Sequence, residues 1–466
     1  MSWRSALIMT APFVKPSEHK LSWRFPRTFW IANVAELFER AAYYGMFISL
    51  TVYLTNIVGF SDIQAGIVAG CFSSVLYLLP PFMGAVADKV GFKAALSSAF
   101  ALLMFGYFSL GAFPTKTLTL ASLFVIMLGG SVVKPVISGT AAQCSDERHR
   151  ARAFSIFYQM VNIGSFSGKA TAYEMRTRFG IEYINYYASA MAFLAFLLVV
   201  FFYRDVTRAG QGKSPRELLL GMLKVLRNVR FMALIFIVAG FWAIQGQLYA
   251  TMPKYILRLL GDGAKPEWLA NINPLVVVLC VLPVTHVVRK AKPENAIGIG
   301  LFIIPFSALI IALSPLIERW LGSSIALPGL GGMHPITMAV IIGIAFQGLA
   351  ECFLSPKFLE YASRQAPPGE TGLYLGYQHL TTFFAWFFGF IISGFLIDRY
   401  CPDPAKLDEA TREAWTSAIA GTGPMPEAYA HAHYIWYFYF GIGVVAFFAL
   451  LMFKLVTGRV DASRGR

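Results

Sequence analysis

The sequence has little charge for its length. Only 14% of its 466 residues are Asp, Glu, Lys or Arg, whereas about a quarter of an ordinary soluble domain is charged. The sequence is also 57% apolar, and this combination excludes intrinsic disorder, which needs low hydrophobicity and high charge. A water-soluble globular domain is excluded on the same grounds.

Cysteine is scarce, and its spacing fits neither paired disulfides nor a metal site. The five cysteines are Cys71, Cys144, Cys280, Cys352 and Cys401. Four of them lie inside apolar segments, so we expect no disulfide framework, no metal and no cofactor.

Acidic residues are outnumbered, with 25 Asp and Glu against 39 Lys and Arg and a net charge of +14. Such a balance can indicate a nucleic-acid partner. Here, however, the basic residues flank long apolar runs, which is typical of membrane proteins. The predicted partner is therefore the lipid bilayer and not nucleic acid. Alternating ten-residue segments typical of β-barrels are missing too.

Twelve segments are long and apolar enough to span a bilayer, which requires about 20 residues per helix. They are 28–56, 62–88, 93–113, 117–143, 152–175, 182–203, 231–259, 267–288, 294–317, 335–363, 371–398 and 432–456. The sequence thus predicts an all-α integral membrane protein with 12 transmembrane helices.

A basic linker divides these helices into two sets of six. We predict helix bundles over 28–203 and 231–456, joined by a cytoplasmic linker at 204–230. Apolar residues at helical spacing in ELLLGMLKVLRN predict a short amphipathic helix within that linker. Segments 1–27 and 457–466 are the predicted cytoplasmic N-terminal segment and tail.

The distribution of basic residues predicts that both termini are cytoplasmic. In that orientation, inner segments hold 25 Lys and Arg and outer loops hold nine, as expected from the positive-inside rule. No signal peptide is recognised. Short loops and a compact plan favour a bacterial inner membrane.

The two halves share a faint internal similarity. The segment that begins at Ala153 and includes Tyr158-Gln159 resembles the one that begins at Gly372 and includes Tyr377-Gln378. Such repeats are typical of secondary transporters, in which the binding site lies between the halves near mid-membrane. We therefore expect the two bundles to be related by a pseudo-two-fold axis.

Ionisable residues inside predicted spans are functional candidates, because a charge at the bilayer centre costs about 2.5–3.5 kcal/mol. The first span carries Glu36, Glu39, Arg40 and Tyr43 at spacings that place them on one side of a helix. We therefore interpret this charged cluster, together with Lys134 of the fourth span, as functional and not as a structural lock.

Four polar groups from four spans are predicted to lie at one level. At about 1.5 Å per residue, Arg40, Asn162 and Glu351 lie roughly 16–18 Å from the inner end, and Lys134 roughly 14 Å. Other polar residues have simpler interpretations. Lys254 and Lys357 are expected to snorkel to the interface and His379 to be structural, whereas the role of Lys169 is left open.

Several motifs resemble those of the proton-dependent oligopeptide transporters within the major facilitator superfamily. The residues that carry this resemblance are Glu36-x-x-Glu39-Arg40-x-x-Tyr43-Tyr44-Gly45, Gly130-x-x-x-Lys134-Pro135, Phe157-Tyr158-x-x-Val161-Asn162-x-Gly164-Ser165, Asn273-Pro274, Glu351-x-x-x-Ser355-Pro356 and, for the superfamily, Gly84 to Lys93. The first and third of these motifs are specific, and the resemblance spans almost the whole chain.

The resemblance implies a monomeric symporter that imports small peptides with protons. The implied substrate-binding residues are Arg40, Tyr43, Tyr44, Tyr77, Lys134, Asn162, Trp242, Asn273 and Glu351. The peptide carboxylate would meet Arg40 and Lys134, and its ammonium would meet Glu351. The implied proton-coupling residues are Glu36, Glu39, Arg40 and Lys134, with Glu39 preferred as the proton carrier.

One departure from the family bears on coupling. The family has an acid in its seventh helix that pairs with the helix 4 lysine, and Gly246 stands in that place. The alternative is therefore a facilitator or uniporter of another small zwitterion or anion. An intramembrane enzyme is disfavoured because no metalloprotease or serine hydrolase motif is present. A signalling protein that has lost transport is disfavoured by the intact Arg40, Lys134 and Glu351.

Overall fold

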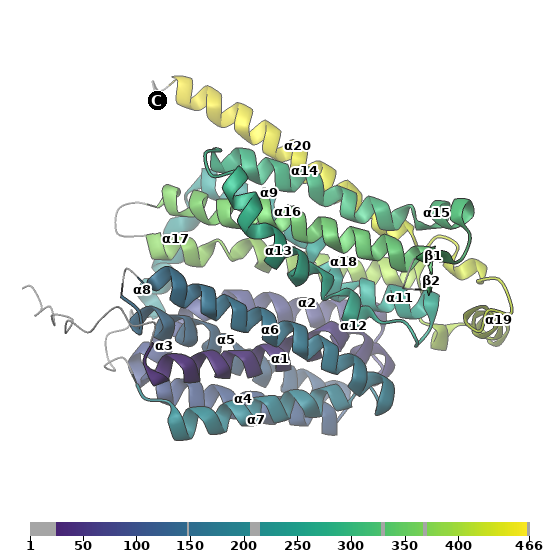
Figure 1. Cartoon of the computed structure of the whole chain (residues 1–466), viewed down its shortest axis with the longest axis horizontal. Helices are drawn as coiled ribbons and strands as arrows, with labels where there is room; N and C mark the ends of the chain where they lie inside the picture. The colour runs from purple at the N-terminus through teal and green to yellow at the C-terminus, as the bar shows by residue number, and fades with distance from the viewer. Residues whose placement is uncertain (1–24, 147–148, 206–214, 328–330, 367–370, 464–466) are drawn as a thin grey trace, which may run out of the picture.

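The computed structural model describes residues 25–146, 149–205, 215–327, 331–366 and 371–463, and these are almost entirely helical (Figure 1). Three parts of the predicted plan lie outside the described residues: most of the N-terminal segment, residues 206–214 of the linker and the end of the tail. The chain folds into two layers of long helices with a common direction, and the first layer contains the N-terminal half.

The N-terminal half is a bundle centred on α1, which packs against α6 and α7. Its helices are α1 (Arg27–Asn56), α2 (Asp62–Leu78), α3 (Pro80–Val90), α4 (Phe92–Ala112), α5 (Lys116–Gln143), α6 (Arg150–Arg178) and α7 (Tyr183–Phe202). The bend of 51° between α2 and α3 divides the predicted span 62–88. Pro80 begins α3, where its missing N–H breaks the helical ladder.

The C-terminal half contains more broken helices. Its helices are α9 (Val229–Gln245), α10 (Gln247–Ala250), α11 (Met252–Leu260), α12 (Pro266–Leu269), α13 (Ile272–Val287), α14 (Pro293–Ala312), α15 (Ser314–Leu321), α16 (Pro335–Gln365), α17 (Thr371–Tyr377), α18 (Leu380–Tyr400) and α20 (Tyr434–Ser463). The predicted spans 231–259, 267–288, 294–317 and 371–398 are therefore each interrupted, and α20 continues into the predicted tail.

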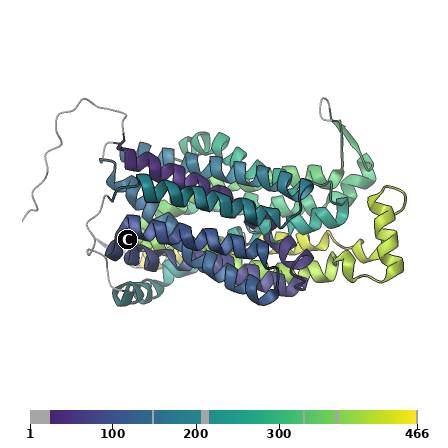
Figure 2. The same ribbon diagram turned by 90° about the horizontal axis from the view of Figure 1, so that it is seen from below.

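The two ends of the helix layers carry different additions. At one end lie the start of α1, the end of α20 and α8 (Pro215–Leu226); we call this the α8 end. At the opposite end, the α19 end, a hairpin of β1 (Ile325–Leu327) and β2 (Gly331–Met333) and the helix α19 (Glu409–Ile419) project beyond the helix layers (Figure 2). The short helices η1 (Pro404–Lys406) and η2 (Glu427–Tyr429) lie on either side of α19 in the chain.

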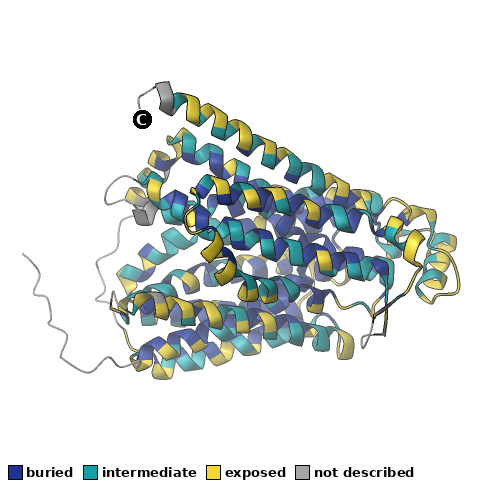
Figure 3. Cartoon of the chain, turned by 45° about the horizontal axis from the view of Figure 1, so that its top comes forward, coloured by how far each residue is buried: buried dark blue, intermediate teal, exposed yellow. Residues whose placement is uncertain are grey.

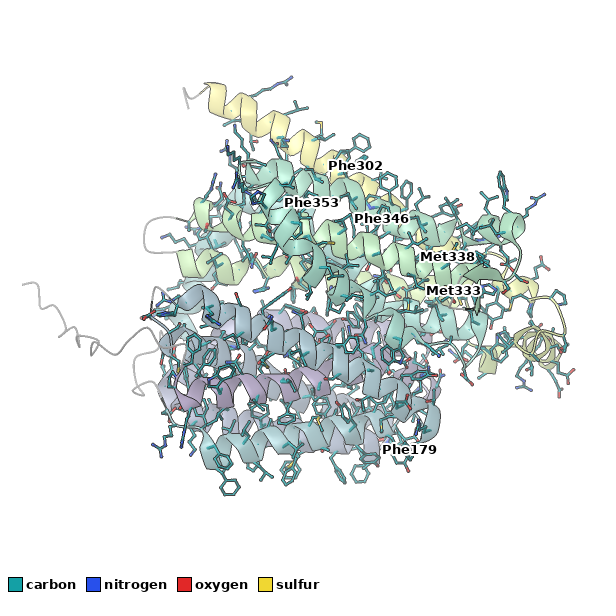
Figure 4. All side chains as sticks on the ribbon, viewed as in Figure 1. Phe179, Phe302, Met333, Met338, Phe346 and Phe353 are labelled. Atoms are coloured by element: carbon teal, nitrogen blue, oxygen red, sulfur yellow. The ribbon has the colours of Figure 1, made fainter. Side chains whose placement is uncertain are left out.

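The outer surface of the bundles is apolar. Within the described residues, nine long helical segments are apolar enough to cross a membrane, and the bent pair α2–α3 makes a tenth. Buried residues line the inner helix faces, whereas outward faces are exposed (Figure 3), and Phe179 and Phe302 point away from the bundles (Figure 4). Since water does not favour such a surface, this is a multi-pass integral membrane protein.

Two of the predicted spans, α1 and α6, form long helices that are less apolar than the ten just described. They contain the polar motifs of the first and fifth spans, which lowers their hydropathy. They also pack against each other inside the first bundle, so one face of each helix is withheld from lipid. The twelve predicted spans are all present as helical segments, and the predicted fold class is confirmed.

The two halves pack closely where α2 meets α18. A side chain at Gly66 would collide with the backbone of Phe390 and Gly394, and a side chain at Gly394 would collide with the backbone of Asp62. Small residues let two helix backbones approach within van der Waals contact, as is common in membrane proteins.

α8 lies between the two halves in the chain. Its Leu219, Leu220 and Leu223 are about half exposed, at 51%, 54% and 49%. An amphipathic helix with an exposed apolar face would suit a position on the bilayer surface.

Candidate functional site

The charged cluster of α1 is buried inside the first bundle. The side chains of Glu36 and Glu39 are 0% and 1% exposed, and that of Arg40 is 12% exposed. Arg40 Nε lies 3.3 Å from Glu36 Oε1, one helical turn away, and the guanidinium also pairs with Glu39. Two carboxylates therefore hold one guanidinium in a fixed position.

Two tyrosines complete the surroundings of Arg40. The guanidinium carbon lies 5.3 Å from the ring centroid of Tyr43 and 5.8 Å from that of Tyr44, within reach of a cation–π interaction. Tyr43 stacks on Phe47 with centroids 5.1 Å apart. This packing gives the cluster a rigid aromatic wall.

A small chamber of about 80 Å³, which we call the Arg40 chamber, lies beside this cluster. It is lined by Glu39, Arg40, Tyr43, Leu76, Tyr77, Pro80, Leu103, Tyr107, Ile126, Gly130, Lys134 and His379. Glu36 stays fully buried within the bundle. The predicted grouping of Glu39, Arg40 and Lys134 is thus present.

A larger cavity of about 470 Å³, the central cavity, lies between the two halves. Seven of the predicted binding residues line it: Tyr44, Tyr77, Lys134, Asn162, Trp242, Asn273 and Glu351. Arg40 and Tyr43 border the Arg40 chamber instead. The structure thus places Arg40 and Glu351, which were assigned to opposite ends of one peptide, on two adjoining spaces. Lys134, Tyr77 and His379 border both spaces.

Glu351 presents its carboxylate to the central cavity from α16. The amide Nε2 of Gln245 on α9 donates a hydrogen bond of 2.6 Å to Glu351 Oε2. Gln245 is only 8% exposed, and its bond orients the acid at the cavity wall. The opposite wall carries Lys134 of α5 and Asn162 of α6.

Several lining residues were not anticipated from the sequence. Lys169, Gln245, Trp386 and Tyr158 all border the central cavity. Three of the α6 residues, Tyr158, Asn162 and Lys169, are spaced four and seven residues apart. This spacing places them along one face of the helix. The spacing was readable from the sequence, but the direction in which that face points was not.

An aromatic ring lies close against the position of the missing acid. A Cβ atom at Gly246 would lie 3.2 Å from Cδ1 and Nε1 of Trp386 and 3.2 Å from the carbonyl oxygen of Trp242. Trp386 also stacks on Phe47 of α1, with centroids 5.4 Å apart. The two halves are thus joined here by aromatic packing.

Buried ion pairs join the halves at the α19 end. Lys254 Nζ lies 2.6 Å from Asp62 Oδ1, and Arg258 Nη2 lies 2.9 Å from the same atom. Arg176 of α6 pairs with Glu267 of α12 at 2.6 Å. These contacts hold α2 and α6 against α11 and α12, so the α19 end is closed.

The expectation that Lys254 and Lys357 snorkel is wrong. Lys254 is 4% exposed because Asp62 draws it inward, although 192 residues separate the two. Lys357 is 6% exposed, and its ammonium donates to the carbonyl of Ala291 at 3.1 Å and pairs with Glu360 at 2.9 Å. The burial of Lys254 is thus offset by an acid of α2, and that of Lys357 by an acid of its own helix and a carbonyl between α13 and α14.

Comparison with known proteins gives a consistent result. The Major Facilitator Superfamily matches residues 33–333. "Dipeptide and tripeptide permease B" of Photorhabdus luminescens is 27% identical over 293 residues, which are 62% of this chain and 55% of that protein. The chain thus matches about half the length of this relative. "Multidrug resistance protein MdtH" of Salmonella arizonae is 21% identical over 358 residues, 76% of this chain and 82% of that protein.

Solved structures show the same fold. The crystal structure of the peptide transporter POT in complex with sulfate has a TM-score of 0.71 and 20% sequence identity, and the match covers 93% of this chain and 95% of that one. The named relative agrees with the resemblance indicated by the motifs, and the solved structure has the same fold as this chain.

Proposed function

The chain belongs to the major facilitator superfamily, and we propose that it is a proton-coupled symporter that imports di- and tripeptides by alternating access. The transport of peptides is inferred from relatives that bear that name and from the chemistry of the central cavity. Both termini would be cytoplasmic, in a bacterial inner membrane, and the chain would act as a monomer.

The observation that carries this proposal is the pairing of opposite charges across the central cavity. Lys134 projects from the N-terminal half and Glu351 from the C-terminal half into one space of about 470 Å³. Volumes of 300–1,000 Å³ are typical of sites for small ligands. A ligand with a carboxylate at one end and an ammonium at the other would bridge the halves.

Peptide ends and backbone supply these groups regardless of side chains. Two or three extended residues span at most about 7–11 Å, a length suited to the gap between two bundles. Asn162 and Asn273, which also line the cavity, offer amide hydrogen bonds to the peptide backbone. Broad tolerance of side chains follows from this arrangement.

Proton coupling is assigned to the α1 cluster. The Arg40 guanidinium is engaged by Glu39 and Glu36. Protonation of Glu39 would release Arg40 for a substrate carboxylate, and a bound carboxylate would favour protonation in return. Glu39 is preferred over Glu36 because Glu39 borders the Arg40 chamber.

Lys134 connects the two spaces, since its side chain borders both. A peptide carboxylate on Lys134 therefore lies next to the Arg40 chamber, and the released guanidinium of Arg40 could join it. Such bidentate, charge-assisted contacts are among the strong ones available to a carboxylate.

Alternating access would use the closure seen at the α19 end. The pairs Asp62–Lys254 and Arg176–Glu267 would separate when the halves rock, while the α8 end closes. With the α8 end in the cytoplasm, the structure corresponds to an inward-facing state.

A second candidate is a facilitator or uniporter without proton coupling. It is favoured by Gly246, because the expected acid is absent and Trp386 lies close against its place. Import of another small zwitterion or anion would then follow its own gradient.

Uptake into proteoliposomes tests both candidates. Purified protein is reconstituted, and labelled dialanine uptake is measured with and without an inward proton gradient. Symport predicts accumulation above equilibrium only with the gradient. Uptake that ignores the gradient would leave the facilitator, and failure of dialanine to enter or to compete would refute peptide transport.

A further inference from the structure

Lys169 is a buried cation that the proposed peptide contacts do not use. Its side chain lies on α6, is 1% exposed, and borders the central cavity. The ammonium donates one hydrogen bond, of 3.2 Å, to the carbonyl oxygen of Ala270 in the other half. An ammonium group has three N–H donors, so this bond leaves two for a ligand.

Lys169 pairs with no acid among the described residues, unlike other buried cations of the chain. Lys254 is held by Asp62 and Arg176 by Glu267. A buried charge without a counter-ion is costly. An unpaired lysine on a cavity wall is therefore a candidate for binding an anion.

Each charged side chain that faces the central cavity has an opposite charge on an acidic peptide. The ionic side chains that line the central cavity, apart from His379, are Lys134, Lys169 and Glu351. Two cations and one carboxylate would be neutralised by a ligand with two carboxylates and one ammonium. A peptide that contains one aspartate or glutamate residue carries this set of charges.

Geometry places Lys169 within reach of such a ligand. The Lys169 ammonium lies 5.6 Å and the Arg40 guanidinium carbon 5.8 Å from the centroid of the same Tyr44 ring, so the two cations are at most about 11 Å apart. Lys169 also lies two helical turns, roughly 10 Å, beyond Asn162 on the same face of α6. These separations match a dipeptide or tripeptide.

We propose that Lys169 binds an anionic side chain of the substrate, so that the protein prefers acidic peptides. This inference rests on the proposed function. The peptide carboxylate would occupy Lys134, the ammonium would meet Glu351, and the side-chain carboxylate would point towards the α19 end and Lys169. Trp242 and Tyr44, which line the same cavity, provide apolar walls along the way.

A structural role for Lys169 makes a different prediction. If its bond to Ala270 serves only to join the halves, loss of the ammonium should affect all peptides by the same factor. If it binds a side chain, only peptides with an acidic residue should be affected. The ratio between matched peptides therefore separates the two roles, and it does not depend on how much protein folds.

The test uses Ala-Glu and Glu-Ala against the neutral isosteres Ala-Gln and Gln-Ala, as competitors of labelled dialanine in proteoliposomes. For the wild type, we expect at least one acidic peptide to compete about tenfold to a hundredfold better than its isostere, the range for a buried charge-assisted hydrogen bond. Lys169→Met should abolish this preference, and Lys169→Arg should retain most of it.

Lys357→Met is the matched control, because Lys357 is also buried and also donates to a backbone carbonyl, that of Ala291. It should leave the preference for acidic peptides unchanged. Equal competition by acidic and neutral peptides in the wild type would overturn the inference, as would a preference that survives Lys169→Met.

Dialanine uptake separates this inference from the proposed function. If dialanine is transported but acidic peptides have no advantage, only the inference fails. If no peptide is bound or transported, both fail. An absent preference in the wild type is decisive by itself. If Lys169→Met does not fold, Lys169→Gln takes its place, and it should abolish the preference in the same way.

Discussion

The role of Glu351 leads to the sharpest prediction. Replacing Glu351 by Gln keeps the size of the side chain and removes its charge. Because Gln245 orients the carboxylate through a bond of 2.6 Å, the acid is held ready for a cation. The substrate ammonium should therefore lose a charge-assisted hydrogen bond, worth about 1.5–3 kcal/mol.

At about 1.4 kcal/mol per factor of ten, the Kd for dialanine should rise about tenfold to a hundredfold. N-acetyl-dialanine, which has no ammonium, should bind wild type and Glu351→Gln within about threefold of each other, since it has no such bond to lose. The two Kd values can be measured by competition against a labelled peptide in detergent, without transport.

Glu174→Gln is a suitable control. Glu174 is another carboxylate within a long helix, but its side chain is 44% exposed and pairs with Arg178 on the surface. It should leave both Kd values unchanged. A loss of equal size for free and acetylated dialanine in Glu351→Gln would refute the assigned role, because it would indicate damage to the cavity as a whole.

Three further predictions follow from other parts of the structure. Asp62→Asn leaves the buried Lys254 without its counter-ion and should lower stability by about 3–5 kcal/mol; an unchanged Tm would contradict this. Glu39→Gln should abolish gradient-driven accumulation of dialanine but retain exchange of internal for external peptide, so persistent accumulation would exclude Glu39 as the proton carrier. Gly246→Glu would restore the family motif, but we expect a lower Tm because Trp386 lies close against that position. Adding Trp386→Ala should recover part of the lost Tm. An undiminished Tm in Gly246→Glu alone would show that the ring moves aside.

Local patterns in the sequence were sufficient to predict the membrane-spanning helices and the charged cluster of α1. Apolar runs determine which segments enter a bilayer, because burial in lipid depends mainly on composition. Glu36, Glu39 and Arg40 meet because residues three and four apart share one helix face. The family motifs add the pairing of Lys134 with Glu351 across the two halves, and both residues do line one cavity.

Helix breaks were only partly predictable. Pro80 marks the bend between α2 and α3, as a residue without a backbone N–H should. At Gly246, the break between α9 and α10 lies beside Trp386 of α18, a contact that the local sequence does not indicate.

Tertiary structure alone decided which cations are paired and which face the cavity. In the sequence, Lys169 and Lys254 are both lysines within apolar spans. Lys254 meets Asp62, whereas Lys169 borders the central cavity and pairs with no acid among the described residues. Helical periodicity defines which residues share a face, but the rotation of each helix against its neighbours depends on side-chain packing from distant parts of the chain, and that rotation determines what each face contacts.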